Sequence, residues 1–287
     1  MSELHKFLFD GLPVRGMLVR LTDAWREVLA RREPGQQFPP ELRQLLGEMS
    51  AAAVLMQSNI KFNGALVLQI MGDGPVKLAV AEAQHDLSFR ATAKCVGEVA
   101  AGANLEAMLN VSGQGRCVIT LDPKDKFPGQ QSYQGVVPLH DDQRQPLHKL
   151  SEVLEHYMLQ SEQLDTKLVL AANDEMAAGL LIQRLPLQGE VNLAGRNLAQ
   201  DEDQIGRNED YNRIALLAAR AAIVAHENLR AFLLAHAAAA VPHLQQPATI
   251  LQLVNPVVTG LLPSVCHRYL RERLPAAADS WCASSSA

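Results

Sequence analysis

The sequence predicts an α+β fold in which a mostly antiparallel sheet packs with helices in a core domain, followed by a helical linker and an atypical C-terminal tail. Apolar residues recur at helical spacing in two long segments and alternate with polar residues in several shorter ones. Clusters of Pro, Gly and polar residues separate these segments. The 287-residue chain is 48% hydrophobic and 20% charged, which is typical of a globular protein.

The first long helix is predicted over residues 39–61 and begins at two prolines. Its apolar stripe predicts an amphipathic helix, and the stripe consists of Leu42, Leu45, Leu46, Met49, Ala53 and Met56. Over residues 64–83 the period becomes two, and "GDGP" forms the predicted turn of a β-hairpin. The apolar residues that mark its two strands are Leu66, Leu68 and Ile70, then Leu78 and Val80.

The rest of the core domain follows the same two patterns. Further strands are predicted over 86–95, 115–123, 132–139, 166–172 and 176–186. A short helical or loop segment is expected near 104–110, and a second helix with an apolar stripe is predicted over 146–164. We therefore expect the core domain to occupy residues 1–186.

Beyond residue 186 the composition changes. A polar, Gly-containing stretch leads into an Ala- and Leu-rich segment, so residues 187–240 are expected to form a partly helical linker. From Ala231 to His267 no charged side chain occurs, but prolines and scattered polar residues in this run argue against a membrane-spanning helix. Residues 241–287 are interpreted as a divergent tail.

Composition and charge exclude several classes of protein. The net charge of -5 and the pI near 6.0, without a basic cluster, argue against a nucleic-acid surface. Four irregularly spaced cysteines do not make a disulfide framework. The N-terminus lacks the long apolar region of a secretory signal, so we expect a cytoplasmic protein.

The sequence contains none of the common catalytic motifs, and no enzyme is predicted. The glycines of "MGDGPVK" also suggest a phosphate cradle, but Pro75 removes a backbone donor and a hairpin turn is the better interpretation. The histidines lack the helical spacing of metal ligands. Cys95 and Cys117 lie in predicted strands and are interpreted as buried, inert thiols.

Five segments, in this order, carry a resemblance to a known family. They are "VRG", "IKFNGALVLQIMGDGPVKLAVAEA", "YQGVVPL", "LEHYMLQSEQLDTKLVLAA" and "AAGLLIQRLP". Together they resemble the 33 kDa chaperonin family, the redox-regulated heat-shock protein 33. The resemblance covers roughly residues 4–218.

The resemblance implies a stress-response chaperone, an ATP-independent holdase that binds unfolding or oxidatively damaged proteins and prevents their aggregation. The family has a core domain, a helical linker and a small zinc domain, and active members tend to form dimers. Its Cys-x-Cys and Cys-x-x-Cys motifs hold Zn²⁺ when reduced. Oxidation converts these thiolates to disulfides, expels zinc and unfolds the linker to expose apolar surface for unfolded or misfolded clients.

The zinc motifs of the family do not occur in this chain, so no cofactor is expected. Cys266 and Cys282 lie where the family keeps its zinc thiolates, and they are the redox candidates. Their spacing matches neither family pair, and a zinc site that includes His267, a disulfide under oxidation, and inert thiols remain as alternatives. The abrupt loss of charge and motif suggests a shifted reading frame, which the nucleotide sequence would test.

Clients are expected to bind the apolar face of the Ala- and Leu-rich segment. The candidate residues on it are Ile214, Leu216, Leu217, Ile223, Leu229, Phe232 and Leu233. The alternative is that this face packs on the core sheet. Three functional hypotheses follow: a holdase with an impaired redox switch, an inactive chaperone relic with a frame-altered C-terminus, and a small-ligand-binding α+β protein.

Overall fold

The computed structural model describes residues 2–9, 13–33, 35–60, 62–125, 131–185 and 211–212. The strands in these ranges are β1 (Glu3–Leu8), β2 (Val14–Leu21), β3 (Gly64–Met71), β4 (Val76–Gln84), β5 (Phe89–Cys95), β6 (Arg116–Pro123), β7 (Tyr133–Pro138), β8 (Thr166–Ala172) and β9 (Ala177–Arg184). The helices are α1 (Asp23–Ala30), α2 (Pro40–Asn59), α3 (Leu105–Leu109) and α4 (Leu150–Gln160). The predicted tail, 241–287, and all but two residues of the predicted linker, 187–240, lie outside the described ranges.

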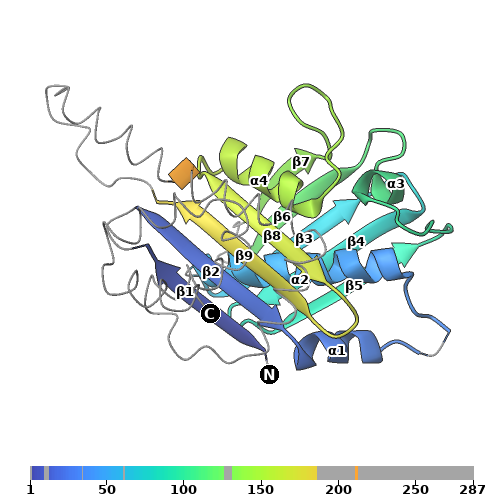
Figure 1. Ribbon diagram of the computed structural model, residues 1–287, viewed down its shortest axis with the longest axis horizontal. Coiled ribbons are helices and arrows are strands. Elements are labelled where there is room, and N and C mark those ends of the chain that lie inside the picture. The colour runs from blue at the N-terminus through green and yellow to red at the C-terminus, as the bar shows by residue number, and fades with distance from the viewer. Residues whose placement is uncertain are drawn as a thin grey trace, which may run out of the picture. The chain divides into compact units, whose positions relative to one another are not determined.

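The strands form two sheets, whose strands cross in the view of Figure 1. The strand order is β1-β2-β9-β8 in the four-stranded sheet and β5-β4-β3-β6-β7 in the five-stranded sheet. Every strand pair whose register is described is antiparallel. The predicted α+β class with an antiparallel core is confirmed, although the sequence did not indicate that the strands divide between two sheets.

The chain divides into two compact units. The first takes in Met1–Lys6 and Pro13–Asn192 and contains all of the elements above except the end of β1. The second takes in Phe7–Leu12 and Leu193–Ala287. In its described part, the rings of Phe7 and Phe9 meet edge to face with their centroids 5.7 Å apart.

Helix α2 forms the centre of the first unit. It packs against β3, β4 and β5 of one sheet and against β2, β8 and β9 of the other. Residues outside its predicted apolar stripe, Ala51, Ala52 and Leu55, are fully buried as well. The helix is confirmed, but the prediction that only one stripe faces the core was wrong, because sheets cover it on two sides. Small residues allow this approach: a Cβ added to Gly47 would lie 2.4 Å from the Cβ of Ala172.

The hairpin of β3 and β4 is confirmed, with Met71 paired to Leu78 across it. On β4, however, alanines rather than the larger apolar residues face α2. Ala79, Ala81 and Ala83 are fully buried, whereas Leu78 and Val80 lie half-buried on the opposite face. The helix packs directly over β4, so only small side chains fit between them.

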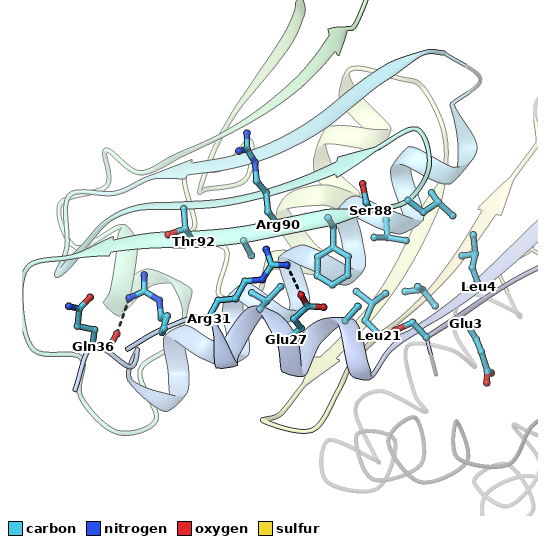
Figure 2. Close-up of a pocket in the computed structure, with 18 of the residues that line it drawn as sticks. Glu3, Leu4, Leu21, Glu27, Arg31, Gln36, Ser88, Arg90 and Thr92 are labelled. Carbon is cyan, nitrogen blue, oxygen red and sulfur yellow. Dashed lines mark hydrogen bonds and ion pairs between the residues drawn. The ribbon is translucent and has the colours of Figure 1, made fainter. Parts of the chain in front are cut away.

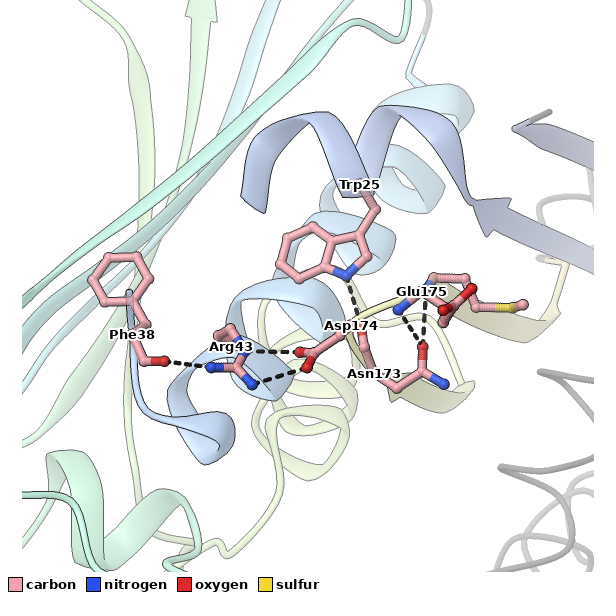
Figure 3. Close-up of polar contacts among 7 residues, drawn as sticks. Trp25, Phe38, Arg43, Asn173, Asp174 and Glu175 are labelled. Atoms are coloured by element: carbon pink, nitrogen blue, oxygen red, sulfur yellow. Dashed lines mark hydrogen bonds and ion pairs between the residues drawn. The ribbon is translucent and has the colours of Figure 1, made fainter. Parts of the chain in front are cut away.

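Two polar contacts fasten the turn between β8 and β9 to the helices (Figure 3). Arg43 of α2 donates two hydrogen bonds to the carboxylate of Asp174, at 2.7 and 2.9 Å, and a third to the carbonyl oxygen of Phe38 at 2.7 Å. The indole N–H of Trp25, fully buried on α1, donates to the carbonyl oxygen of Asn173 at 2.7 Å. This turn of the four-stranded sheet is thereby held against the helical layer.

Candidate functional site

The site residues predicted from the sequence lie outside the described ranges. They are the client-binding candidates Ile214, Leu216, Leu217, Ile223, Leu229, Phe232 and Leu233 and the redox candidates Cys266 and Cys282. Their roles stay predictions. The described core offers other surfaces, which the sequence did not indicate.

The two described cysteines differ in environment. Cys117 on β6 is fully buried, and burial raises the pKa of its thiol to about 12. At neutral pH this thiol stays protonated and unreactive, as the sequence predicted. Cys95 on β5 is only half-buried, and its thiol donates a hydrogen bond to the carbonyl oxygen of Gly97 at 3.2 Å.

These two thiols are too far apart to act together. In the sheet order β4 and β3 lie between β5 and β6, which places Cys95 and Cys117 about 14 Å apart at roughly 4.8 Å per strand. A disulfide requires Cα atoms within about 7 Å, and one zinc ion requires thiolates closer still. Among the described residues, no group of three or more His, Cys, Asp or Glu side chains is placed to hold a metal ion. This part of the chain does not fit the zinc site that the resemblance implies.

Two of the motifs that carry the resemblance hold the scaffold together. Arg15 of "VRG" donates from Nε to Oε1 of Gln183 at 2.9 Å, and Nε2 of the buried Gln183 donates to Oγ1 of Thr166 at 2.6 Å. In "GDGP", the carboxylate of Asp73 accepts a hydrogen bond from the amide of Ser112 at 3.0 Å. The amide of Ser112, a backbone donor near the turn, is therefore already hydrogen-bonded to Asp73 and not free for a phosphate. This supports the interpretation of "GDGP" as a hairpin turn and not as a phosphate cradle.

The outer face of the five-stranded sheet, turned away from α2, carries a patch of apolar side chains with polar residues among them. Cross-strand register brings it together, because Met71 pairs with Leu78 and Val118 pairs with Val136. Gln69 lies between Val80 and Val118 in the same row. We name this patch the outer surface, and it consists of Val67, Met71, Leu78, Val80, Val118 and Val136.

Solvent reaches much of the outer surface. Val136 is 59% exposed, and the other members are half-buried except Val118, which is 6% exposed. Charged residues border the patch: Arg90 forms a salt bridge with Glu82 at 2.6 Å. An apolar patch with a charged rim is typical of a surface that binds other proteins.

The outer face of the four-stranded sheet is also apolar. Val14, Ala178 and Ile182 are buried there, and Leu18 and Leu180 are half-buried. The sequence contains a pattern that indicates this apolar outer face. Strands β8 and β9 are near-continuous apolar runs rather than alternating ones, a pattern typical of strands with apolar residues on both faces.

Buried polar groups in this unit support structure. Glu155 of α4 receives hydrogen bonds from the amide of Leu168 at 2.8 Å and from Nζ of Lys167 at 2.6 Å, which covers the edge of β8. Desolvation outweighs these bonds and raises the pKa of Glu155. Burial and a hydrogen bond to Glu162 likewise raise the pKa of Tyr157.

None of the described helices is long and apolar enough to cross a bilayer.

Comparison with known proteins gives a consistent result. The family model described as Hsp33 protein matches residues 2–239. A 33 kDa chaperonin of Chromobacterium violaceum is 50% identical over 209 residues, which cover 70% of this chain and 66% of that protein. A 33 kDa chaperonin of Methylobacillus flagellatus is 42% identical over 218 residues, covering 76% and 64%.

Among solved structures, the crystal structure of a 33 kDa chaperonin (heat shock protein 33 homolog) from Thermotoga maritima is similar. Its TM-score is 0.48 at 19% identity, and the match covers 64% of this chain and 61% of that one. The chain matches just under two thirds of the length of the two curated relatives named above.

Proposed function

The chain belongs to the Hsp33 protein family, and from that premise we propose that it is an ATP-independent holdase chaperone. It binds unfolding or oxidatively damaged proteins and keeps them from aggregating, and it pairs with a second copy when active. The curated relatives are named chaperonins, which supports a binding role and not an enzymatic one.

The observation that carries this proposal is the outer surface. Its members offer hydrophobic contact without directional hydrogen-bonding groups, so they favour apolar segments with little preference for sequence. Burying a Val or Leu side chain contributes about 1.5–3 kcal/mol, and less where it is already half-buried. Association costs about 4 kcal/mol or more in lost translational and rotational freedom. This cost offsets much of the burial energy, so one segment binds weakly. An unfolding client presents several such segments, and its binding is tighter for that reason.

We further propose that client binding does not depend on oxidation. Neither Cys-x-Cys nor Cys-x-x-Cys occurs in the sequence, and strand order separates Cys95 from Cys117. Without paired thiolates there is no zinc to expel and no disulfide pair to form in the family manner. The surface that the switch controls in the family is then available in the reduced chain.

Sedimentation of a heat-labile enzyme tests the chaperone proposal. The enzyme is heated without nucleotide, with the full reduced chain or with serum albumin at equal mass, and the soluble fraction is measured. We expect the chain, and not albumin, to keep the enzyme soluble and to leave the unheated enzyme unbound. An equal loss of enzyme in both samples would favour the relic or the ligand-binding hypothesis.

A further inference from the structure

A groove of about 770 Å³ separates α1 from strand β5. Figure 2 shows Glu27 of α1 and Arg31, the residue after this helix, on one side and Ser88, Arg90 and Thr92 on the other. Its apolar lining comes from strands and helices of the core, and includes Leu4, Val19, Leu21, Val28 and Val54. The groove is therefore lined by apolar and polar side chains in about equal measure, with a strand along one wall.

That strand is an edge of its sheet, and its outward backbone groups are open. The amide of Gln84 donates to the carbonyl oxygen of Ser88 at 2.8 Å. This bond shows which residue pairs of β4 and β5 are hydrogen-bonded to each other and which are not. Because antiparallel pairing alternates, the N–H and C=O groups of Phe89 and Ala91 point away from β4. Across this edge the described residues supply no hydrogen-bond partner to either.

The edge of β8 is different, and the contrast is informative. There the side chain of Glu155 accepts a hydrogen bond from the amide of Leu168 at 2.8 Å, and α4 packs against the strand. A capped edge cannot pair with another chain, whereas an open edge is a template for strand addition. The open edge of β5 lies beside a partly apolar groove of the size that ligands use.

The charges that line the groove define what fits it. Three acidic side chains (Glu3, Glu27 and Glu33) and three arginines (Arg31, Arg32 and Arg90) line it, so they balance. Most are already engaged with other groups: Arg31 with Glu27 at 2.5 Å, Glu3 with Arg20 at 2.9 Å, and Arg90 with Glu82 at 2.6 Å. Because acidic and basic side chains are equal in number and most of them are engaged, the groove favours neither sign of charge, and the complementary occupant is an uncharged segment that is at least partly apolar.

We propose that this groove binds an extended, uncharged and at least partly apolar segment of an unfolding client, which adds to β5 as a further strand of the five-stranded sheet. The inference rests on the proposed chaperone function and names the mode of recognition. Backbone hydrogen bonds to Phe89 and Ala91 hold segments of differing sequence. The strand part of this wall, from Phe89 to Thr92, is about 13 Å long at 3.3 Å per residue, which suits a paired segment of about four residues.

The added strand also lies close to the outer surface. Its side chains alternate, so one set enters the groove while the other set stands on the outer face of the sheet. There it lies beside Thr92, which pairs with Val80 of the outer surface. One client segment thus occupies the groove and lies one strand away from the outer surface.

A peptide pair tests the mode of binding. The probe is a labelled peptide of alternating valine and threonine with one lysine at each end, and its partner has every backbone nitrogen between the lysines methylated, so that neither edge can pair. Fluorescence anisotropy with the full chain gives both affinities. We expect the methylated peptide to bind at least tenfold more weakly, because it cannot pair with the edge of β5. Equal affinities overturn the proposal.

Variants place the binding site. Ala91→Pro removes an outward N–H, a change that edge strands tolerate, and should weaken peptide binding at least tenfold. Ala24→Arg fills the groove from α1 without touching β5 and should do the same, whereas Ala30→Arg, exposed on the same helix, should bind as the parent chain does. If Ala91→Pro does not fold, Ala24→Arg and Ala30→Arg still test whether the peptide binds in the groove. Equal binding by Ala24→Arg and Ala30→Arg refutes the site.

Hydrogen exchange and aggregation assays complete the test. In the free chain the amides of Phe89 and Ala91 should exchange quickly and become protected with peptide. Slow exchange without peptide, together with no peptide binding, would mean that another part of the chain fills the groove, and it overturns the proposal. If the chain suppresses aggregation but groove variants change nothing, the groove proposal alone fails. If the peptide binds as expected but aggregation is not suppressed, the chaperone proposal alone fails.

Discussion

Replacing valines of the outer surface by threonine tests whether that surface binds clients. Val80→Thr and Val136→Thr, made together, keep side-chain shape and strand propensity while adding a hydroxyl to each position. A client that covers these positions would bury each hydroxyl without a partner, at a cost of about 1–2 kcal/mol per residue. The pair should therefore weaken client binding by about 2–4 kcal/mol, which is about 30-fold or more.

The assay is light scattering from an aggregating client at increasing concentrations of chaperone. We expect the double variant to need at least tenfold more protein for half-suppression. Its unfolding midpoint should hardly change, because Val136 is 59% exposed and Val80 half-buried. The matched control, Val96→Thr with Val111→Thr, alters two valines that are 60% and 63% exposed but lie off the outer surface. If both double variants suppress aggregation as well as the parent, the outer surface is not the client site.

Three further outcomes follow from the core. Iodoacetamide should label Cys95 but not Cys117 in the folded chain, since burial raises the pKa of Cys117 to about 12; mass spectrometry showing equal labelling would contradict this. Gly47→Val should lower the free energy of unfolding in urea by about 1–3 kcal/mol through overpacking against Ala172, and an unchanged midpoint would show that the helix can shift. The raised pKa of Glu155 favours its protonated form in the fold, so stability is greatest below the unfolded pKa near 4.5 and falls as pH rises through the folded value. Unfolding at several pH values should show that Glu155→Gln removes this fall, and identical pH profiles would contradict it.

Local periodicity was enough to predict the elements of the core from α2 onward, whereas β1, β2 and α1 were not predicted. The helix from Pro40 to Asn59 and the hairpin of β3 and β4 show their periods within a single stretch of sequence, and both are confirmed. The pairing of β2 with β9 could not be read in this way. It joins Val14 to Arg184 and depends on tertiary packing, which no local pattern records.

The outer surface was missed for the same reason. Val118 and Val136 belong to two strands and become neighbours only through cross-strand register. A partial signal was present in β4, where small and large apolar residues alternate as Ala79, Val80 and Ala81. This alternation shows which face packs against a close helix, but only once the helix is known to lie there.

Light scattering before and after peroxide treatment tests the central claim most directly. The full reduced chain and the same chain treated with peroxide are compared for suppression of aggregation of a thermally unfolding enzyme, without nucleotide. A chain that keeps the core of its family but lacks the paired zinc cysteines should suppress aggregation equally in both states. Strong suppression only after peroxide would contradict the account, since it would require a working redox switch in this chain.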